Sequence, residues 1–146
     1  MADAKNFPVF NKVIELLKSW ANFLKPQRTG LSEPEYIGLW GELFTLTEII
    51  LPTHTPFNTM RFWVGPEGKK QDFTLNKIAI EVKTSFSSEA RKITISSLEQ
   101  LDVITEKLYL LHIVANPSEP QLGYSLKDLY DKSLSLISQD PQSEMI

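Results

Sequence analysis

The stretch that most constrains the fold of this chain is KKQDFTLNKIAIEVKTSF, residues 69–86, where apolar and polar residues alternate around one polar pair. That pair, Asn76-Lys77, predicts a two-residue turn between two antiparallel strands. Counting outward from the turn places Asp72 directly opposite Glu81, so both side chains leave the hairpin on the same side. The other side of the hairpin is fully apolar and carries Phe73, Leu75, Ile78, Ile80 and Val82.

Two opposed carboxylates repel each other, so the pairing of Asp72 with Glu81 needs an explanation. A divalent cation between them removes the repulsion, and Mg²⁺ is commonly held by one or two carboxylates together with waters and substrate phosphate. Alternation adds Lys83 to the same side, and two carboxylates, a metal and an ammonium can form a site for phosphodiester hydrolysis. The alternative interpretation is a solvated hairpin face with a cross-strand ion pair.

The composition of the chain excludes several kinds of site. Its 146 residues suit one domain with a single core. The absence of cysteine excludes disulfides and thiolate metal sites, and a zinc site is not expected from two distant histidines, His54 and His112. No apolar run has the roughly 18–20 residues of a membrane span, and the N-terminus does not resemble a signal peptide. We therefore expect a cytoplasmic protein with no membrane partner.

The charge pattern bears on contact with nucleic acid. A net charge of −3 argues against strong non-specific adhesion to it. Basic residues nevertheless gather around the hairpin; they are Lys69, Lys70, Lys77, Lys83, Arg91 and Lys92. The candidates for contact with nucleic acid among them are Lys69, Lys70, Arg91 and Lys92. The alternative is that they are scattered surface lysines that only solvate the protein.

Two helices are predicted before the hairpin. Apolar residues recur at helical spacing over residues 6–24, which predicts an amphipathic helix. Ser32 and Glu35 form the pattern of a capping box and start a second helix. We expect this second helix to end near Leu51, because Pro52 follows.

The second predicted helix carries two glycines and a glutamate that bear on the site. Gly38 and Gly41 each cost about 1 kcal/mol relative to alanine inside a helix, so they are expected where another backbone approaches closely. Glu42 follows directly, among apolar neighbours. It is either a surface residue at the edge of the apolar stripe or a carboxylate delivered to a site.

Three further strands are predicted from short β-prone runs. Residues 57–64 are aromatic and β-prone, and residues 92–96 alternate. Residues 108–115 form a nearly continuous apolar run, which is typical of a central strand buried on both faces. His112 lies in this run and is expected to be a core histidine rather than a catalyst.

Two further helices are predicted in the second half of the chain. Residues 97–100, Ser-Leu-Glu-Gln, resemble a second capping box, and Ser125 is expected to cap a last helix. Gln100 has two interpretations: reciprocal capping of its helix, or contact with a metal-bound water or a phosphate.

Together these elements predict an α/β (α+β) fold with a mixed sheet and the order α-α-β-β-β-β-α-β-α. We expect a single domain over residues 1–146. It comprises an N-terminal helix in residues 1–30, a core in residues 31–137 and a polar tail in residues 138–146.

Four segments stand in a fixed order along the chain. They are Gly-Leu-Trp-Gly-Glu-Leu (38–43), Gln-Asp-Phe (71–73), Glu-Val-Lys-Thr-Ser (81–85) and Ser-Ser-Leu-Glu-Gln-Leu (96–101). In this order they resemble the PD-(D/E)XK nuclease superfamily, and in particular a bacterial branch associated with restriction systems. The resemblance spans roughly residues 31–135 and implies a restriction-endonuclease-like core.

The chain departs from this family pattern in two ways. Gln71 stands where the name of the motif has proline, a position that varies widely in the superfamily. Relatives in this branch are longer at both ends, so target recognition is expected to reside outside this chain.

The resemblance implies a role for each matching residue. Asp72, Glu81 and the backbone carbonyl of Val82 would bind Mg²⁺, with Mn²⁺ as an alternative ion. Lys83 would orient or activate the attacking water and stabilise charge that develops on the phosphate. Glu42 matches the helix glutamate that many members place near the metal.

These inferences predict a Mg²⁺-dependent endonuclease with DNA as its partner and a role in restriction or phage defence. A homodimer, or partner subunits of a restriction system, would fit this role. The alternative is a catalytically inactive scaffold or DNA-binding subunit of the same fold, which the acidic balance and the short chain favour. The intact set of Asp72, Glu81 and Lys83 favours the enzyme.

Overall fold

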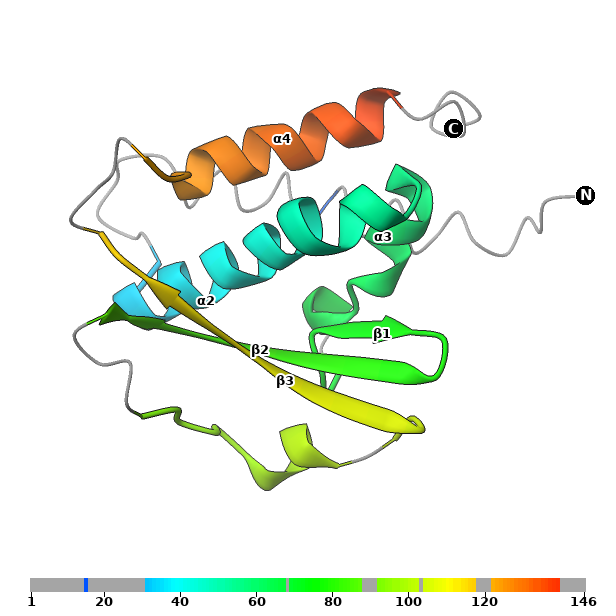
Figure 1. Cartoon of the computed structure of the whole chain (residues 1–146), viewed down its shortest axis with the longest axis vertical. Helices are drawn as coiled ribbons and strands as arrows, with labels where there is room; N and C mark the ends of the chain where they lie inside the picture. Colours follow the sequence, from blue (N-terminus) through cyan, green and yellow to red (C-terminus); the bar gives the residue numbers. More distant parts are fainter. Residues whose placement is uncertain are drawn as a thin grey trace, which may run out of the picture.

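A computed structural model of the chain describes residues 15, 31–67, 69–87, 92–102, 104–117 and 122–139 (Figure 1). Apart from residue 15, the helix predicted over residues 6–24 lies outside this part of the chain, as does the tail from residue 140 onward. Within it, a small mixed sheet packs against α-helices, as expected for the α+β class.

The first described helix, α2 (Glu33–Phe44), begins at the predicted capping box. Glu35 Oε2 accepts a hydrogen bond from the backbone N–H of Ser32 (2.8 Å), and the Ser32 hydroxyl accepts one from the backbone N–H of Glu35 (3.5 Å). The helix continues as a π-helical segment over Thr45–Ile50 and a 3₁₀ turn over Leu51–Thr53. The turn contains Pro52, so the helical run stops close to its predicted end.

The last helix, α4 (Leu126–Gln139), also begins where its sequence predicts. The Ser125 hydroxyl accepts a hydrogen bond from the backbone N–H of Asp128 (3.1 Å), and Asp128 Oδ2 accepts one from the backbone N–H of Ser125 (2.8 Å). The predicted cap is therefore confirmed. None of the described helices is long and apolar enough to cross a membrane.

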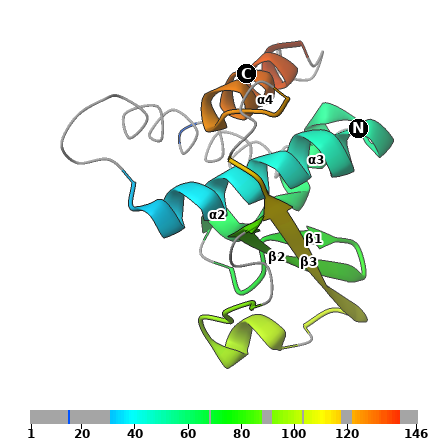
Figure 2. The ribbon, with the colours of Figure 1, turned by 60° about the vertical axis from the view of Figure 1, so that its left-hand side comes forward.

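The sheet has the strand order β1-β2-β3, formed by Phe73–Leu75, Ile78–Phe86 and Lys107–Ala115. β1 and β2 are antiparallel and β3 runs parallel to β2, so the long strand β2 is the centre of the sheet. α2 lies across one side of the sheet, with α4 packed on it farther out (Figure 1). Residues 92–102 cross the other side, as the turned view shows (Figure 2).

The hairpin has the register that its sequence predicts. The pairs are Phe73 with Ile80, Thr74 with Ala79 and Leu75 with Ile78. Asn76 closes the turn with a φ of 52°, a left-handed conformation that asparagine adopts more readily than most residues. Extended by one residue beyond the pair of Phe73 with Ile80, the same register would set Asp72 opposite Glu81.

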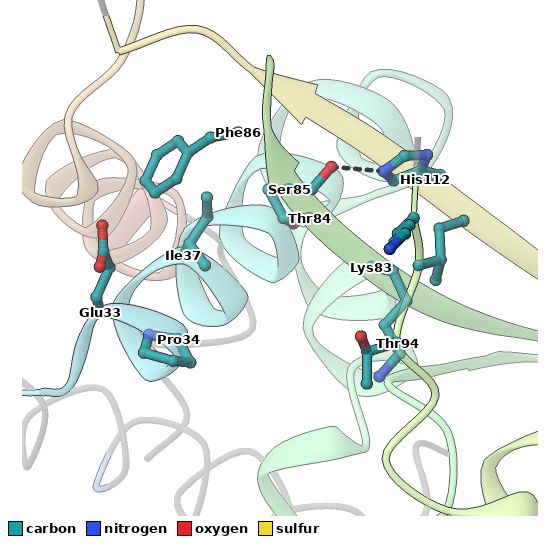
Figure 3. A pocket seen from close by; sticks show the side chains of 11 residues that line it. Glu33, Pro34, Ile37, Lys83, Thr84, Ser85, Phe86, Thr94 and His112 are labelled. Atoms are coloured by element: carbon teal, nitrogen blue, oxygen red, sulfur yellow. Dashed lines mark hydrogen bonds between the residues drawn. The ribbon is translucent and has the colours of Figure 1, made fainter. Parts of the chain in front are cut away.

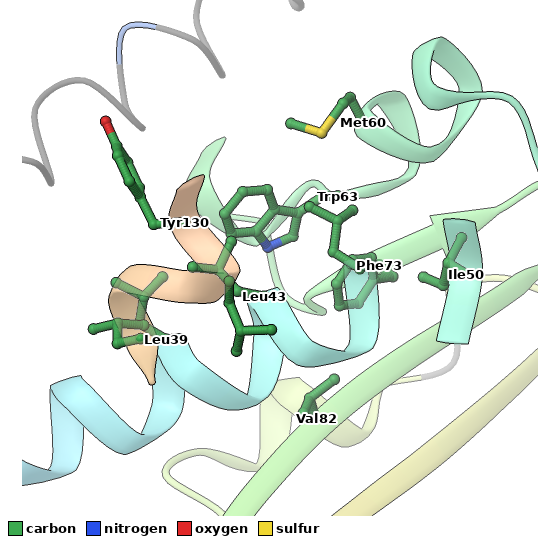
Figure 4. Close-up of a cluster of buried hydrophobic side chains, with 11 residues drawn as sticks. Leu39, Leu43, Ile50, Met60, Trp63, Phe73, Val82 and Tyr130 are labelled. Carbon is green, nitrogen blue, oxygen red and sulfur yellow. The ribbon is translucent and has the colours of Figure 1, made fainter. Parts of the chain in front are cut away.

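Part of the apolar face of the hairpin, including Phe73 and Val82, is buried under the helices (Figure 4). Phe73 and Val82 from this face contribute to a core whose buried members are Leu39, Leu43, Leu46, Ile50, Met60, Trp63, Phe73, Val82, Leu126, Leu129 and Tyr130. Burial of apolar surface therefore explains why the apolar residues of the hairpin lie on one face. It does not explain why carboxylates lie on the opposite face, at the candidate active site.

The strand predicted over residues 57–64 is wrong. Residues Pro56–Phe62 form a short helix, α3. Thr55 caps it by accepting a hydrogen bond from the backbone N–H of Asn58 (3.3 Å), and the proline occupies the first turn, where its missing N–H costs nothing. Only Trp63 keeps a strand-like role, as a single bridge to Phe73.

The predictions of a strand over residues 92–96 and of a helix after it are also wrong. Residues 92–96 are irregular, and only a 3₁₀ turn over Leu98–Leu101 follows them. Ser97 makes no side-chain cap. Without the capping bond, and with Leu98 and Leu101 exposed rather than packed, little stabilises a longer helix.

The strand predicted over residues 108–115 is present as β3, but it is not central. Among the described residues it pairs only with β2, so it forms an edge of the sheet. Tyr109, Leu110 and Val114 are exposed. The apolar run therefore predicts the strand correctly, but the prediction that this strand is buried on both faces is wrong.

The two glycines of α2 should respond differently to substitution. A Cβ at Gly41 would overlap the Thr84 hydroxyl, whereas a Cβ at Gly38 would meet no described atom within 4 Å. We expect Gly41→Ala to lower the free energy of unfolding by about 1–3 kcal/mol through overpacking. Gly38→Ala is the matched control and should raise it by up to about 1 kcal/mol through helix propensity.

Urea unfolding monitored by tryptophan fluorescence would measure both variants. Equal effects of the two substitutions would contradict the close packing of α2 on β2 at Gly41.

Candidate active site

Asp72 lies at the start of the hairpin and is held from two sides. Its carbonyl accepts hydrogen bonds from the backbone N–H groups of Val64 (2.8 Å) and Gly65 (2.9 Å). Its carboxylate Oδ2 accepts another from the backbone N–H of Val82 (2.8 Å). The carboxylate is therefore fixed against the middle of β2.

Glu42 reaches the same place from α2. Its Oε2 accepts a hydrogen bond from the indole N–H of Trp63 (2.7 Å). A Cβ built at Gly65 would lie 3.2 Å from this oxygen and 3.1 Å from Asp72 Oδ1, so both carboxylates border the space beside this glycine. Of the two interpretations of Glu42, the structure favours the carboxylate delivered toward Asp72.

The electrostatics of this corner favour neutral acids. Burial raises the pKa of Glu42 to about 8, and the negative charge of Asp72 adds to the rise, while the Trp63 hydrogen bond opposes it. Burial also raises the pKa of Asp72 to about 6; the hydrogen bond from Val82 opposes this rise and the charge of Glu81 adds to it. At both residues, burial and the charge of a neighbouring carboxylate thus disfavour the ionised form.

Glu81 and Lys83 form the other half of the candidate site. Lys83 Nζ lies 2.9 Å from Glu81 Oε1, with the glutamate side chain 1% exposed and the lysine side chain 19% exposed. The second carboxylate oxygen, Oε2 of Glu81, is buried and has no hydrogen-bond partner among the described residues. A buried charged oxygen without a partner is costly, so this atom points to a missing donor or cation.

Gln100 comes to the site from the far side of the sheet. Its Oε1 accepts hydrogen bonds from Lys83 Nζ (3.1 Å) and from the backbone N–H of Ser96 (3.2 Å). Gln100 does not take part in a capping box, because Ser97 has no side-chain cap. The lysine ammonium is thus held between an acid and a neutral amide oxygen.

Gln71 holds the segment that carries Gln100. Its side chain is buried, and its Nε2 donates hydrogen bonds to the backbone carbonyls of Gln100 (3.2 Å) and Asp102 (3.0 Å). Beside it, Lys70 Nζ pairs with the Asp102 carboxylate at 2.7 Å. Gln71, which stands where the name of the motif has proline, therefore anchors the segment of Gln100 and Asp102 in this chain.

The donor set suits a hard divalent cation, which prefers oxygen ligands. Two observations fit such an ion: the unpartnered Oε2 of Glu81, and the raised pKa values of Glu42 and Asp72, both of which a nearby positive charge would relieve. In the described part of the chain, no group of three or more His, Cys, Asp or Glu residues is already arranged to hold an ion.

The basic candidates for contact with nucleic acid have different surroundings where the structure describes them. Lys69 is exposed, and Lys70 is engaged with Asp102. Lys92 lines a pocket beside Lys83. Arg91 lies outside the described residues.

Three residues that shape the site, Trp63, Gly65 and Gln71, are not evident from the sequence alone. The sequence places Trp63 in a strand, and its hydrogen bond to Glu42 depends on a contact between distant segments. Gly65 has the sequence context of a turn glycine, and it is also the residue that leaves space for two carboxylates. The sequence shows that Gln71 replaces the proline of the motif, but it does not predict which groups the amide binds.

A helix glutamate, a hairpin aspartate and a Glu-X-Lys strand on an α+β fold define a nuclease-like protein of the PD-(D/E)XK class. A family model described as "Putative PD-(D/E)XK family member, (DUF4420)" matches residues 2–145, and the chain belongs to this family. The resemblance inferred from the four sequence segments is thereby confirmed. Neither a curated protein nor a solved structure matches the chain. Nucleases of the PD-(D/E)XK class typically use divalent metals.

Loss of the Gln71 amide should weaken both the fold and the placement of Lys83. In Gln71→Leu, the backbone carbonyls of Gln100 and Asp102 lose their donor, and we expect a loss of about 1–3 kcal/mol in the free energy of unfolding. Lys70→Ala removes only an exposed ion pair on the same segment and should cost at most about 1 kcal/mol. Urea titrations of both variants measure this difference, and a larger effect for Lys70→Ala would contradict it.

Proposed function

We propose that this protein is a metal-dependent endonuclease that hydrolyses phosphodiester bonds in DNA. Membership of a PD-(D/E)XK family supports a nuclease. The observation that carries the proposal furthest is Glu81, a buried acid with one oxygen on Lys83 and the other without a partner among the described residues. A scaffold gains nothing from such an arrangement, because an unsatisfied buried carboxylate oxygen destabilises the fold.

In this proposal Asp72, Glu81 and the Val82 carbonyl would hold a Mg²⁺ or Mn²⁺ ion, with Glu42 beside them. The ion would supply positive charge that polarises the phosphate. Lys83 places a second positive charge next to Glu81, where it can orient the attacking water and stabilise the charge that develops on the phosphate oxygens.

Glu42 has a further task in the metal-free protein. With a pKa of about 8 it is largely protonated at neutral pH. Because the Trp63 indole donates to Oε2, the proton is favoured on Oε1. Glu42 thus limits the negative charge of this corner of the site and becomes a ligand when it loses this proton.

Cleavage of a supercoiled plasmid tests the proposal. Full-length protein with Mg²⁺ or Mn²⁺ should produce nicked and linear forms, and EDTA should prevent this. Asp72→Ala and Lys83→Ala should reduce the rate by at least roughly 10²–10³-fold. Lys77→Ala, a lysine at the hairpin turn that pairs with Glu106, is the matched control and should cleave like wild type.

The alternative is an inactive scaffold or DNA-binding subunit with the same fold. One observation supports it: in the described part of the chain, no group of three or more His, Cys, Asp or Glu residues is arranged to hold an ion. Absence of cleavage on plasmid, linear duplex and single-stranded DNA with both ions would select this alternative. Cleavage that survives Asp72→Ala would instead point to a contaminating nuclease.

We further propose that the enzyme acts in restriction or phage defence in the cytoplasm, as a homodimer or with partner subunits of a restriction system. This part of the proposal follows from the resemblance to restriction-associated relatives. Phage plating efficiency on cells that express wild type or the Asp72→Ala variant would test it. Equal plating on both strains would argue against a defence role.

A further inference from the structure

A pocket of about 430 Å³ lies beside Lys83 and extends along the last residues of β2 (Figure 3). Its lining includes Lys83, Ser85 and His112 from the sheet and Lys92 and Thr94 from the segment that follows β2. Because Lys83 belongs both to this pocket and to the candidate active site, whatever binds in the pocket lies next to the reacting group.

The sheet register brings the polar lining together. Lys83 in β2 pairs with His112 in β3, and alternation places Ser85 on the same face as Lys83. The Ser85 hydroxyl and His112 Nε2 lie 2.8 Å apart. If the ring nitrogen carries the proton, the serine hydroxyl is left free to donate outward. If it does not, the other ring nitrogen carries the proton and can donate.

The charges and the walls of the pocket suit a phosphodiester. Lys83, which pairs with Glu81, and Lys92 are two cations on its lining, and the exposed Glu33 is the one acid among the lining residues. Lys92 forms no ion pair with any residue that the structure describes. Ile37 and Phe86 add an apolar wall, against which the sugar next to the phosphate can pack (Figure 3).

We propose that this pocket binds the backbone phosphate next to the scissile phosphate, through Lys92, Ser85 and His112. This inference rests on the proposed function, which places the scissile phosphate at Lys83. Two residues of a strand advance by roughly 6.4–6.8 Å, which is similar to the spacing of consecutive phosphates along a nucleic-acid strand. Lys83 and Ser85 therefore match two successive phosphates. His112 is a binding residue in the pocket and not merely a core histidine.

DNA binding by full-length protein tests the assignment without relying on cleavage. The background is Asp72→Asn in EDTA, and the readout is fluorescence anisotropy of a labelled duplex titrated at several salt concentrations. Adding Lys92→Ala should raise Kd about 3–10-fold and reduce the slope of log Kobs against log salt by about 0.9, the loss of one phosphate contact. Lys77→Ala, outside the pocket, should change neither quantity.

Variants of Ser85, His112 and Glu33 extend the same binding experiment. Ser85→Ala and His112→Ala should each weaken binding several-fold, while His112→Gln, which keeps a donor, should retain most of it. Glu33→Gln should tighten binding, because it removes the acid that opposes the phosphate. Thermal melts of each variant separate loss of binding from loss of folding, and His112→Gln stands in where His112→Ala does not fold.

The outcomes are distinct for the pocket and for the nuclease. If the Lys92, Ser85 and His112 variants bind DNA like their parent, the pocket assignment is wrong even when wild type cleaves plasmid. If these variants bind poorly while wild type cleaves nothing, the pocket assignment stands and the nuclease proposal fails. Stabilisation by inorganic phosphate that requires Lys92, in a protein without DNA affinity, would mark a site for free phosphate and overturn the assignment.

Discussion

Replacement of Asp72 by Asn should yield a folded protein that no longer cleaves DNA and that Mg²⁺ no longer stabilises. Asparagine keeps an oxygen that can accept the hydrogen bond from the Val82 N–H, so the local geometry is retained. It removes a charge that raises the pKa of Glu42, and we therefore expect the metal-free variant to be at least as stable as wild type. It also removes the proposed metal ligand, which should end both the stabilisation by Mg²⁺ and the proposed cleavage.

Thermal melts with and without Mg²⁺ measure this effect. A ligand that binds only the folded state stabilises wild type by about 2.7 kcal/mol at a hundredfold excess over Kd. For a chain of this size, that corresponds to a rise of about 5–10 °C in Tm. Asp72→Asn should show no rise, and Lys77→Ala should show the full one. An equal Mg²⁺ shift in wild type and Asp72→Asn would mean that Asp72 is not a ligand, and the scaffold would become the better interpretation.

The second large effect is a loss of stability of the metal-free protein with rising pH. Glu42 has an ordinary pKa of 4.5 and a pKa of about 8 in the fold, and Asp72 moves from 3.8 to about 6. Between these values the folded state holds more protons than the unfolded state, so the free energy of unfolding falls as pH rises. The loss begins near pH 4, has its Asp72 part complete above pH 6, and continues through pH 8 because of Glu42.

Glu42→Gln isolates the larger contribution. Glutamine keeps the oxygen that accepts the Trp63 hydrogen bond but cannot ionise. We expect the free energy of unfolding of this variant to be nearly constant from about pH 6 to about pH 8, whereas wild type loses on the order of 1–2 kcal/mol. Urea titrations in EDTA at several pH values measure both curves. Parallel curves for the two proteins would exclude Glu42 as the titrating group.

Saturating Mg²⁺ should flatten the wild-type curve as well. A cation favours the ionised carboxylates, so its binding releases protons and its affinity rises with pH. Isothermal calorimetry in two buffers of different ionisation enthalpy would count the released protons. Glu42→Gln should release fewer protons than wild type.

Local sequence is sufficient for the elements whose physics is local. The hairpin register follows from one turn and the period of two along a strand, and these alone place Asp72, Glu81 and Lys83 on one face. The capping boxes at Ser32 and Ser125 likewise depend only on residues a few positions apart. The family resemblance is readable for the same reason, since its four segments stand in order along the chain.

Propensity fails where it competes with a local cap or lacks tertiary support. Residues 57–64 are β-prone, yet Thr55 and Pro56 start a helix there, because a capped first turn outweighs a weak strand preference. Residues 92–96 alternate, yet no described strand pairs with them, and a strand needs a partner for its backbone groups.

The amino-acid sequence by itself determined the hairpin, the helix starts at Ser32 and Ser125, and the hairpin face that carries Glu81 and Lys83. Only the tertiary structure decided what surrounds that face. It brought Trp63 to Glu42, opened space at Gly65, anchored the Gln100 segment through Gln71 and set Ser85 against His112. The three hydrogen-bonded contacts among these join residues 21, 29 and 27 positions apart, and a pattern of short period carries no information about which distant segments meet. The physical reason is that such contacts are selected by packing of the whole core, in which every element fixes the position of its neighbours.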